Sequence, residues 1–458
     1  MAAAAAVVLS ATGAAPAVAS PGNATAGARA AAAPGSARAD FDGDGYPDVA
    51  IGAPGGTVNG RSGAGYFSVV YGMGNGPDGV KRQVISQDRY GIPGTAEAGD
   101  RFGSDLTAAD LDGDGCTDLV VGSPGEDVGS ARDVGRQTVL WGSVGGLVDA
   151  AVVGEGRAAT RAGDFDGDGH LDLATAYETR YGPIGRSGVP ARTGPLVDAD
   201  VRVHAMAAGD VDGDGRTDLV VSSGSWDSDG GTVPPPRLQL LRGTRNGFAE
   251  GPFIAAADTV SADSVALADV DHDGRLDVVF GRSTAPGGGL VGTVRGVPGG
   301  FAERATLIGQ NTPGVPGTGE SGDRFGTDVS VGDVTGDGYA DVVAGMPGED
   351  HAGRTDAGTF AVLRGSRTGL SGGAVQVFGQ NTAGVPGTAE NGDAFGGGTA
   401  VVGGYVVVSA PKENSGSGGV WVFPGTASGI TAAGSVSYGP HALAAPETGA
   451  RLGSAFQR

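Results

Sequence analysis

The most informative feature of this chain is a nine-residue acidic loop joined to a short apolar run: Asp40-Phe41-Asp42-Gly43-Asp44-Gly45-Tyr46-Pro47-Asp48, then Val49-Ala50-Ile51-Gly52. The loop has the form D-x-D-x-D-G-x-x-D. Short β-branched runs that end at glycine are typical of buried strands. The stretch therefore predicts a sharp acidic turn that feeds directly into a strand.

This loop-and-strand unit recurs along the whole chain. Six copies start at Asp40, Asp110, Asp164, Asp210, Asp269 and Asp333, which lie 70, 54, 46, 59 and 64 residues apart. A long repeat period is typical of propellers, solenoids and arrays. The chain has 458 residues with 91 Gly and 25 Pro, and it shows no long helical periodicity. This composition predicts an all-β fold with many turns.

The loop chemistry predicts bound calcium. Positions 1, 3 and 5 carry short carboxylates that a curved backbone can turn inward, and position 9 adds a fourth. Glycine at position 6 permits the positive φ of a sharp turn, and position 7 is expected to offer its backbone carbonyl. Calcium is a hard cation that takes six to eight oxygen ligands. An EF-hand is excluded, because its loop closes with glutamate at position 12 between helices.

The predicted calcium ligands follow this pattern through all six loops, which implies about six Ca²⁺ ions. In the sixth loop Thr335 replaces the aspartate at position 3, so weaker binding, or binding through the hydroxyl or a water, is expected there. The alternative is that these are acidic surface turns without function, although six repeats in register argue against it. The predicted ligands are Asp40, Asp42, Asp44, Tyr46, Asp48, Asp110, Asp112, Asp114, Cys116, Asp118, Asp164, Asp166, Asp168, His170, Asp172, Asp210, Asp212, Asp214, Arg216, Asp218, Asp269, Asp271, Asp273, Arg275, Asp277, Asp333, Thr335, Asp337, Tyr339 and Asp341.

Each unit contains enough apolar runs for four strands. One strand enters the acidic loop and one leaves it, a third ends in glycine, as in Phe67–Gly72, and a fourth follows, as in Arg82–Ile85. Four-stranded sheets repeated around an axis form a β-propeller.

A seventh unit keeps the repeat but lacks the acidic loop. Its Phe395-Gly396 and Ala410-Pro411 match the equivalent elements of the sixth unit, while an apolar hairpin around Gly403-Gly404 replaces the loop. The first unit lacks an entering strand, and Gly449–Phe456 near the C-terminus resembles the entering segment Gly99–Leu106. The sequence therefore predicts seven four-stranded blades, with the C-terminal strand pairing with the first blade to close the ring.

At this point the chain resembles the FG-GAP repeat family, which includes the N-terminal propeller of integrin α chains. The resemblance implies a calcium propeller with its acidic loops on one face and its ligands on the opposite face. It is weakest in the third to fifth units, which lack clear FG and GAP elements, and the absence of a D-x-S-x-S motif means that an integrin-like heterodimer is not implied. The motifs that carry it are Phe102-Gly103, Phe325-Gly326 and Phe395-Gly396 for FG, and Gly52-Ala53-Pro54, Gly122-Ser123-Pro124, Gly345-Met346-Pro347 and Ser409-Ala410-Pro411 for GAP.

Three long connectors are expected on the face opposite the acidic loops. They span Gln87–Gly103, Gln310–Gly326 and Gln380–Gly396 and share Q-[DN]-x-x-G-[VI]-P-G-T-x-E-x-G-D-x-F-G. Their glutamates are candidate ligand-binding residues. The alternative is structural, and it is favoured for the aspartates, which would cap a turn, and for the phenylalanines, which would pack between blades. The candidate glutamates are Glu97, Glu320 and Glu390, and the aspartates are Asp100, Asp323 and Asp393.

Charge and the N-terminal segment bear on the location and partners of the protein. The formal charge is −22, which argues against nucleic acid or anionic lipid as a partner. Residues 1–19 resemble a signal peptide with an A-x-A site at residues 17–19, residues 20–39 read as a disordered linker, and residues 40–458 as the propeller. No other stretch reaches transmembrane length, so no membrane insertion is expected. With one cysteine, Cys116, the chain has no internal disulfide.

These features predict a secreted, calcium-binding, non-catalytic propeller that recognises an extracellular protein or glycan, as an adhesion module and as a monomer. No catalytic residues are expected: the one G-x-S-x-G match, at residues 369–373, is no more than chance allows in so glycine-rich a chain. The alternative is a carbohydrate-active enzyme, such as a polysaccharide lyase or hydrolase, or a lectin on the same scaffold. The fold by itself does not decide between them.

Overall fold

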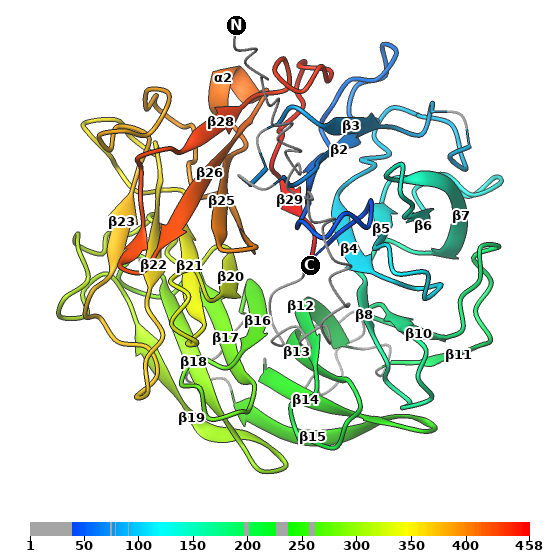
Figure 1. The fold of residues 1–458 in the computed structure, drawn as a ribbon, viewed down its shortest axis with the longest axis horizontal. Coiled ribbons are helices and arrows are strands. Elements are labelled where there is room, and N and C mark those ends of the chain that lie inside the picture. The colour runs from blue at the N-terminus through cyan, green and yellow to red at the C-terminus, as the bar shows by residue number, and fades with distance from the viewer. Residues whose placement is uncertain are drawn as a thin grey trace, which may run out of the picture. The chain divides into compact units, whose positions relative to one another are not determined.

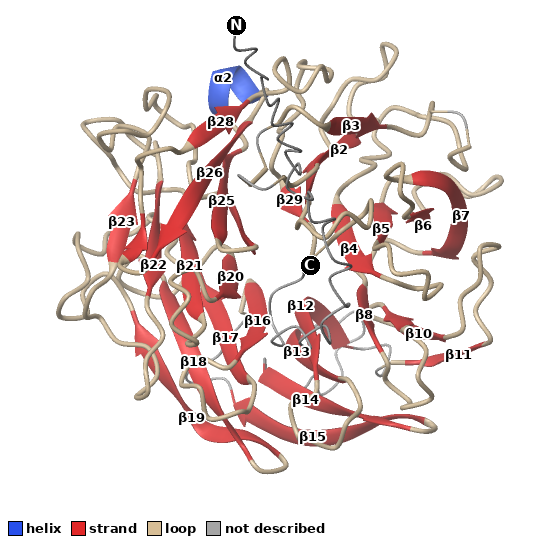
Figure 2. Cartoon of the chain, viewed as in Figure 1, coloured by secondary structure: helices blue, strands red, loops and turns tan. Residues whose placement is uncertain are grey.

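The computed structural model describes residues 39–458 except 74–75, 78, 90, 197–200, 226–236 and 256–261. Within these residues the chain forms seven antiparallel sheets arranged as the blades of a β-propeller (Figures 1 and 2). The helical exception there is the short turn α2 (Glu413–Gly416). The predicted seven-bladed, all-β fold is therefore confirmed.

Each blade is built from consecutive strands, with the closing strand β29 as the exception. Blade 1 contains β29 (Ala455–Phe456), β1 (Val49–Ala53), β2 (Tyr66–Val70) and β3 (Arg82–Ile85). Blade 2 contains β4 (Asp105–Ala109), β5 (Asp118–Ser123), β6 (Arg136–Trp141) and β7 (Val148–Glu155). Blade 3 contains β8 (Arg161–Gly163), β9 (Asp172–Ala174), β10 (Glu178–Tyr181) and β11 (Arg192–Pro195).

The remaining blades follow the same order. Blade 4 contains β12 (Val201–Gly209), β13 (Asp218–Ser225), β14 (Arg237–Thr244) and β15 (Gly247–Ala255). Blade 5 contains β16 (Ser264–Ala268), β17 (Asp277–Arg282), β18 (Leu290–Val297) and β19 (Gly300–Ile308). Blade 6 contains β20 (Val329–Gly332), β21 (Asp341–Met346), β22 (Thr359–Leu363) and β23 (Gln376–Phe378). Blade 7 contains β24 (Gly398–Val402), β25 (Tyr405–Ala410), β26 (Gly419–Thr426) and an outer strand in two pieces, β27 (Gly429–Ile430) and β28 (Val436–Tyr438).

The strand order places the loops on two opposite faces. In each blade the first strand lies at the hub, where the seven first strands stand side by side in a ring (Figure 1). Because neighbouring strands are antiparallel, the acidic loop between strands 1 and 2 and the turn between strands 3 and 4 leave the sheet at the same edge. The connectors from strand 4 to the next blade leave at the other edge. The predicted separation of acidic loops and long connectors follows from this topology.

The C-terminal strand closes the ring as predicted. β29 pairs with β1 through Ile51–Phe456 and Gly52–Ala455. The next side chain continues the pairing, since Gln457 accepts a hydrogen bond from the Ala50 N–H (2.7 Å) and donates one to the Asp48 carbonyl (2.9 Å). Blade 1 therefore combines three strands from the start of the propeller sequence with one strand from its end.

The hydrophobic core is divided among the seven junctions between neighbouring blades. Each cluster of buried apolar side chains draws on two adjacent blades; Phe360 of blade 6 and Phe395 ahead of blade 7, for example, lie 5.8 Å apart between ring centroids. Among the described residues the junctions 2–3 and 3–4 hold eight and seven buried members, against thirteen to nineteen elsewhere. Among these residues, blade 3 therefore contacts the two smallest apolar clusters.

Two predictions concern the N-terminal part of the chain. The proposed signal peptide at 1–19 lies outside the described residues, as does the linker up to residue 38. Ala39, at the end of the predicted linker, packs in the core between blades 1 and 2, and its carbonyl accepts a hydrogen bond from the Asp48 N–H (2.6 Å). Within the described residues, no helix is both long and apolar enough to cross a bilayer.

Candidate metal sites

The first acidic loop is held in shape by its own aspartates. Asp40 at position 1 accepts hydrogen bonds from the backbone N–H groups of Asp44 (3.0 Å) and Gly45 (2.9 Å), one on each carboxylate oxygen. Gly45 has φ +91°, which a side chain would oppose, so glycine at position 6 is required as predicted. The same two bonds to position 1 recur in the other five loops.

The aspartate at position 9 ties each loop to the third strand of its blade. Asp48 is fully buried, and its carboxylate accepts from the Phe41 N–H (2.7 Å) and from the Gly72 N–H (2.8 Å). The equivalent bonds are made by Asp118, Asp172, Asp218, Asp277 and Asp341. This structural role comes in addition to the predicted ligand role, and it explains why the third strand ends in glycine: in every loop blade the position-9 carboxylate sits against that glycine N–H.

Burial raises the pKa of these position-9 carboxyl groups. The pKa reaches about 7 for Asp48 and Asp118, because burial opposes the charged form and the neighbouring loop aspartates add repulsion. It reaches about 6 for Asp172, Asp218, Asp277 and Asp341 for the same reasons. A bound divalent cation would relieve both effects at once, so the electrostatics favour a metal.

The fold brings three carboxylates together in five of the six loops, with one oxygen from each within 4.8 Å of the others. The groups are Asp40/Asp42/Asp48, Asp110/Asp112/Asp118, Asp164/Asp166/Asp172, Asp210/Asp212/Asp218 and Asp269/Asp271/Asp273. An all-oxygen donor set of this kind fits calcium. The sixth loop, which has Thr335 at position 3, is outside this set of carboxylate groups, and the weaker binding expected there stays a prediction.

Other predicted ligands lie at the periphery of these groups. In the first four loops the position-5 aspartate is not one of the three close carboxylates. In all six loops the position-5 carboxylate accepts a hydrogen bond from the backbone N–H of position 7. The carbonyl role predicted for position 7 therefore stays a prediction. Cys116 at this position is buried and free, and burial raises the pKa of its thiol.

On the opposite face, the long connectors are built around buried polar side chains. Asp323 accepts a hydrogen bond from the Glu320 N–H (2.6 Å), and Asp393 accepts one from the Glu390 N–H (2.6 Å). Asp100 does the same with Glu97. The aspartates thus cap turns, and the connector phenylalanines are fully buried between blades. This geometry is the one that the structural alternative expects for these six residues. The side chains of Glu97, Glu320 and Glu390 are exposed.

Sequence reasoning missed a glutamine–glutamate pair at each long connector, in which the glutamine is buried. The first residue of the connector donates from its side chain to a glutamate just after the GAP-like element of the next blade: Gln87 to Glu126, Gln310 to Glu349 (2.6 Å) and Gln380 to Glu413 (2.6 Å). At the first junction Arg136 forms an ion pair with Glu126. At the last, burial and the nearby Asp393 raise the pKa of Glu413 to about 7. The repeated glutamine at the head of each connector was the available signal.

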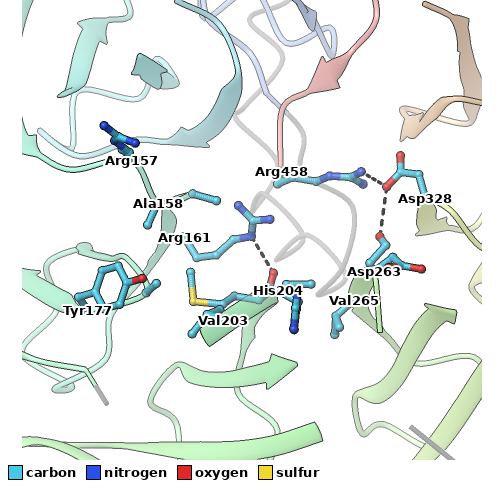
Figure 3. A pocket seen from close by; sticks show the side chains of 15 residues that line it. Arg157, Ala158, Arg161, Tyr177, Val203, His204, Asp263, Val265, Asp328 and Arg458 are labelled. Atoms are coloured by element: carbon cyan, nitrogen blue, oxygen red, sulfur yellow. Dashed lines mark hydrogen bonds and ion pairs between the residues drawn. The ribbon is translucent and has the colours of Figure 1, made fainter. Parts of the chain in front are cut away.

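A pocket of about 410 Å³ lies at the hub, where the inner strands of blades 3 to 6 converge (Figure 3). Its lining includes Arg161, whose Nε donates to the Met206 carbonyl (2.8 Å), and Arg458, which pairs with Asp328. Burial lowers the pKa of Arg161, and the positive charge of Arg458 acts in the same direction. Three arginines, Arg157, Arg161 and Arg458, therefore line this cavity together with Asp263 and Asp328.

The described part of the chain is thus a seven-bladed propeller with metal-binding geometry on one face. The FG-GAP repeat family matches residues 33–70, 102–140 and 325–363, and the FG-GAP-like repeat matches residues 210–280. The last match covers a region in which no clear FG or GAP element was expected. The chain is an FG-GAP repeat protein whose propeller resembles that of integrin α chains.

Two curated relatives match part of this chain. The chain is 32% identical over 219 residues to integrin alpha-PS2 of Drosophila melanogaster, which covers 43% of this chain and 14% of that protein. It is 29% identical over 162 residues to the phosphatidylinositol-glycan-specific phospholipase D of Rattus norvegicus, covering 33% and 19%. The chain therefore spans less than one-fifth of either relative. A Bacteroides uniformis structure provisionally described as a 6-phosphogluconolactonase aligns with TM-score 0.45 at 12% identity, over 86% of this chain and 96% of that one, which is too weak to bear on function.

Proposed function

We propose that this protein is a calcium-stabilised propeller that acts outside the cell as a non-catalytic recognition module for a protein or glycan. The observation that carries the proposal is the recurrence of three converging carboxylates in five loops on one face. Six Ca²⁺ ions would reduce the formal charge from −22 to about −10. Much of the acidity of the chain would then serve its metal sites.

The face opposite the acidic loops is the proposed recognition surface. It carries the three long connectors, which join blades 1–2, 5–6 and 6–7 and present exposed Glu97, Glu320 and Glu390. These connectors cover one arc of the ring, since three of the seven junctions have them. The matched relatives, an integrin and a phospholipase D, are extracellular or secreted proteins, which supports the proposed location. The expected signal peptide at residues 1–19 supports it as well.

The hub pocket favours a second candidate, binding of an acidic saccharide. Its volume of about 410 Å³ suits a ligand of one or two sugar units, and a ligand carboxylate would compete with Asp105 for the guanidinium group of Arg161. This candidate corresponds to the lectin or carbohydrate-active enzyme alternative. It makes Arg161→Met a useful variant, because loss of saccharide binding in that variant would place the ligand at the hub.

Calcium dependence is tested by metal analysis and thermal unfolding. Metal that binds only the folded state adds about 2.7 kcal/mol per site at one hundred times its Kd. We therefore expect about six Ca²⁺ per chain and a melting temperature at least about 10 °C lower in excess EGTA than in millimolar calcium. An unchanged melting curve, or folded protein that contains no calcium, would contradict the proposal.

The recognition role is tested on calcium-loaded protein with a glycan array and a panel of acidic polysaccharides assayed for cleavage. Saturable binding without turnover would support a lectin-like module. Turnover would contradict the non-catalytic assignment in favour of the enzyme. Binding to neither would direct the search to protein partners.

A further inference from the structure

Every acidic loop in the propeller is paired with a basic side chain from another segment. In blades 4 to 6 this residue is an arginine directly before the glycine that ends the third strand. The pairs are Arg242 Nε to Asp212 Oδ2 (3.1 Å), Arg295 to Asp271 Oδ2, and Arg364 Nη2 to Asp337 Oδ2 (3.3 Å). In blade 6, where Thr335 stands at position 3, the arginine pairs with position 5 instead.

In blades 1 to 3 an aromatic residue occupies the position before that glycine, and a lysine or arginine side chain stacks on its ring. The stacked pairs are Lys81 on Tyr71 (4.9 Å to the ring centroid), Arg186 on Trp141 (5.6 Å) and Arg192 on Tyr181 (3.3 Å). Each cation also pairs with the position-3 aspartate: Lys81 with Asp42, Arg186 with Asp112 (2.9 Å) and Arg192 with Asp166 (2.7 Å). Both arrangements therefore place one positive charge beside an aspartate of the acidic loop, at position 3 in blades 1 to 5 and at position 5 in blade 6.

Blade 7 is an internal control for this association. It has no acidic loop, and the residue before its third-strand glycine, Gly425, is Pro424, which is neither basic nor aromatic. The basic or aromatic residue therefore occurs in the six blades with a loop and is missing from the one without. General charge balance would not confine it to this single position.

The contact is made with a carboxylate that a metal would use. In the first four loops the position-3 Oδ1 accepts a hydrogen bond from the position-5 N–H, as in Asp42 with Asp44 (3.3 Å) and Asp212 with Asp214 (3.1 Å). In these loops Oδ2 makes no such backbone hydrogen bond, and the basic side chain contacts it. A calcium ion and this side chain would therefore compete for the negative charge of one carboxylate.

We propose that these six basic side chains are built-in counter-ions that hold the acidic loops when calcium is absent and are displaced from the loop aspartates when calcium binds. This inference rests on the proposed calcium function and adds its regulation. It has two consequences: the ion-free propeller is more stable, and its calcium affinity is lower, than the aspartates alone would give. Arg186 comes from the β10–β11 connection of blade 3, so at blade 2 the exchange also alters a contact between blades.

The test compares two triple variants with identical changes in charge. The loop triple is Arg242→Met, Arg295→Met and Arg364→Met. The control triple is Arg245→Met, Arg304→Met and Arg367→Met, which removes exposed arginines from the same three blades without any ion pair to an acidic loop. Both are measured by calcium titration calorimetry and by thermal unfolding in EGTA.

We expect the loop triple to bind calcium about two- to fivefold more tightly at the affected sites than the control triple, the range that partly exposed ion pairs produce. In EGTA it should unfold at a lower temperature than the control. Equal calcium affinity in the two triples would overturn the competition. Equal melting in EGTA would overturn the stabilising role.

The design separates this inference from the proposed function. A wild-type protein that shows no calcium binding would refute the calcium function, while the EGTA comparison would still decide whether the arginines hold the loops. If the loop triple does not fold in EGTA, the single variant Arg364→Met, whose partner Asp337 is exposed, is compared with Arg367→Met under the same conditions. Identical behaviour of these two single variants would also overturn the inference.

Discussion

Blades 6 and 7 share the arrangement of their first three strands but differ in the connection between strands 1 and 2. Both follow a long connector with a buried phenylalanine, and both hold a glutamine–glutamate pair at their entry. In blade 6 the first two strands are joined by the acidic loop Asp333–Asp341, whereas in blade 7 Val402 and Tyr405 pair directly across Gly403-Gly404. The first three strands of both blades keep the same antiparallel order.

The difference shows that the acidic loop is not needed to form a blade. In blade 6 the N–H of Gly365 at the end of the third strand donates to the Asp341 carboxylate (3.0 Å). In blade 7 the N–H of Gly425 donates to the backbone carbonyl of Gly404 (3.0 Å). A plain hairpin therefore satisfies the same backbone group without any charge. Since a blade forms without the loop, six acidic loops are best explained by the ion that we propose they bind.

The largest expected effect in blade 6 comes from removing its position-9 carboxylate. Asp341→Ala leaves the N–H groups of Gly365 and Val334 buried without a partner, which costs about 1–3 kcal/mol each. We expect a loss of about 2–5 kcal/mol in the free energy of unfolding, measured by urea denaturation in EGTA so that ion loss does not contribute. Asp337→Ala, an exposed member of the same loop, is the control. If both variants lose the same stability, the structural role of position 9 is wrong.

A loop exchange tests whether the acidic segment serves only the metal. Replacing residues 333–340 with Gly-Gly gives blade 6 the connection that blade 7 has. We expect an unchanged far-ultraviolet circular dichroism spectrum and one fewer Ca²⁺ per chain by elemental analysis. A protein that no longer folds would show that the loop is required for the blade, and an unchanged calcium content would show that the sixth loop is not a site.

The junctions predict a smaller, pH-dependent effect. The folded-state pKa of Glu413 is raised to about 7, mainly by burial, so between its ordinary value and that pH the folded protein holds a proton that the unfolded chain releases. Stability should therefore fall as pH rises from about 4.5 to about 7. In saturating calcium, Glu413→Gln should flatten this dependence in urea denaturation. An unchanged slope in Glu413→Gln would show that this carboxyl group does not hold the proton.

The smallest effect on stability is expected from the exposed connector glutamates. The triple variant Glu97→Lys, Glu320→Lys and Glu390→Lys should melt within about 1 °C of the wild type, since surface substitutions away from buried contacts change stability little. Binding to a partner found by the screens above should change measurably. Unchanged binding would remove these glutamates from the recognition surface.

Much of this architecture was predictable because its signals are local and repeated. The spacing of the aspartates, the apolar run after each loop and the glycine at the end of the third strand lie within one blade and predicted six blades, and the matches at Phe395-Gly396 and Ala410-Pro411 predicted the seventh. The closing strand was predictable as well, because Gly449–Phe456 repeats an entering segment that blade 1 lacks. The converging carboxylates of Asp40, Asp42 and Asp48 follow from the turn itself.

The contacts between segments were not predictable from one sequence. Nothing in the residues around Arg186 indicates that it reaches the loop of the preceding blade, 72 residues away. The pairing of Gln380 with Glu413 likewise depends on how a connector crosses to the next sheet.

By itself, the sequence determined the repeat, the acidic turns and the closure of the ring, because each depends on neighbouring residues and backbone geometry. Only the tertiary structure decided which charges meet. It placed a lysine or arginine side chain beside each acidic loop and a glutamate beside the first glutamine of each long connector. Packing blades around an axis brings together side chains that no local pattern connects.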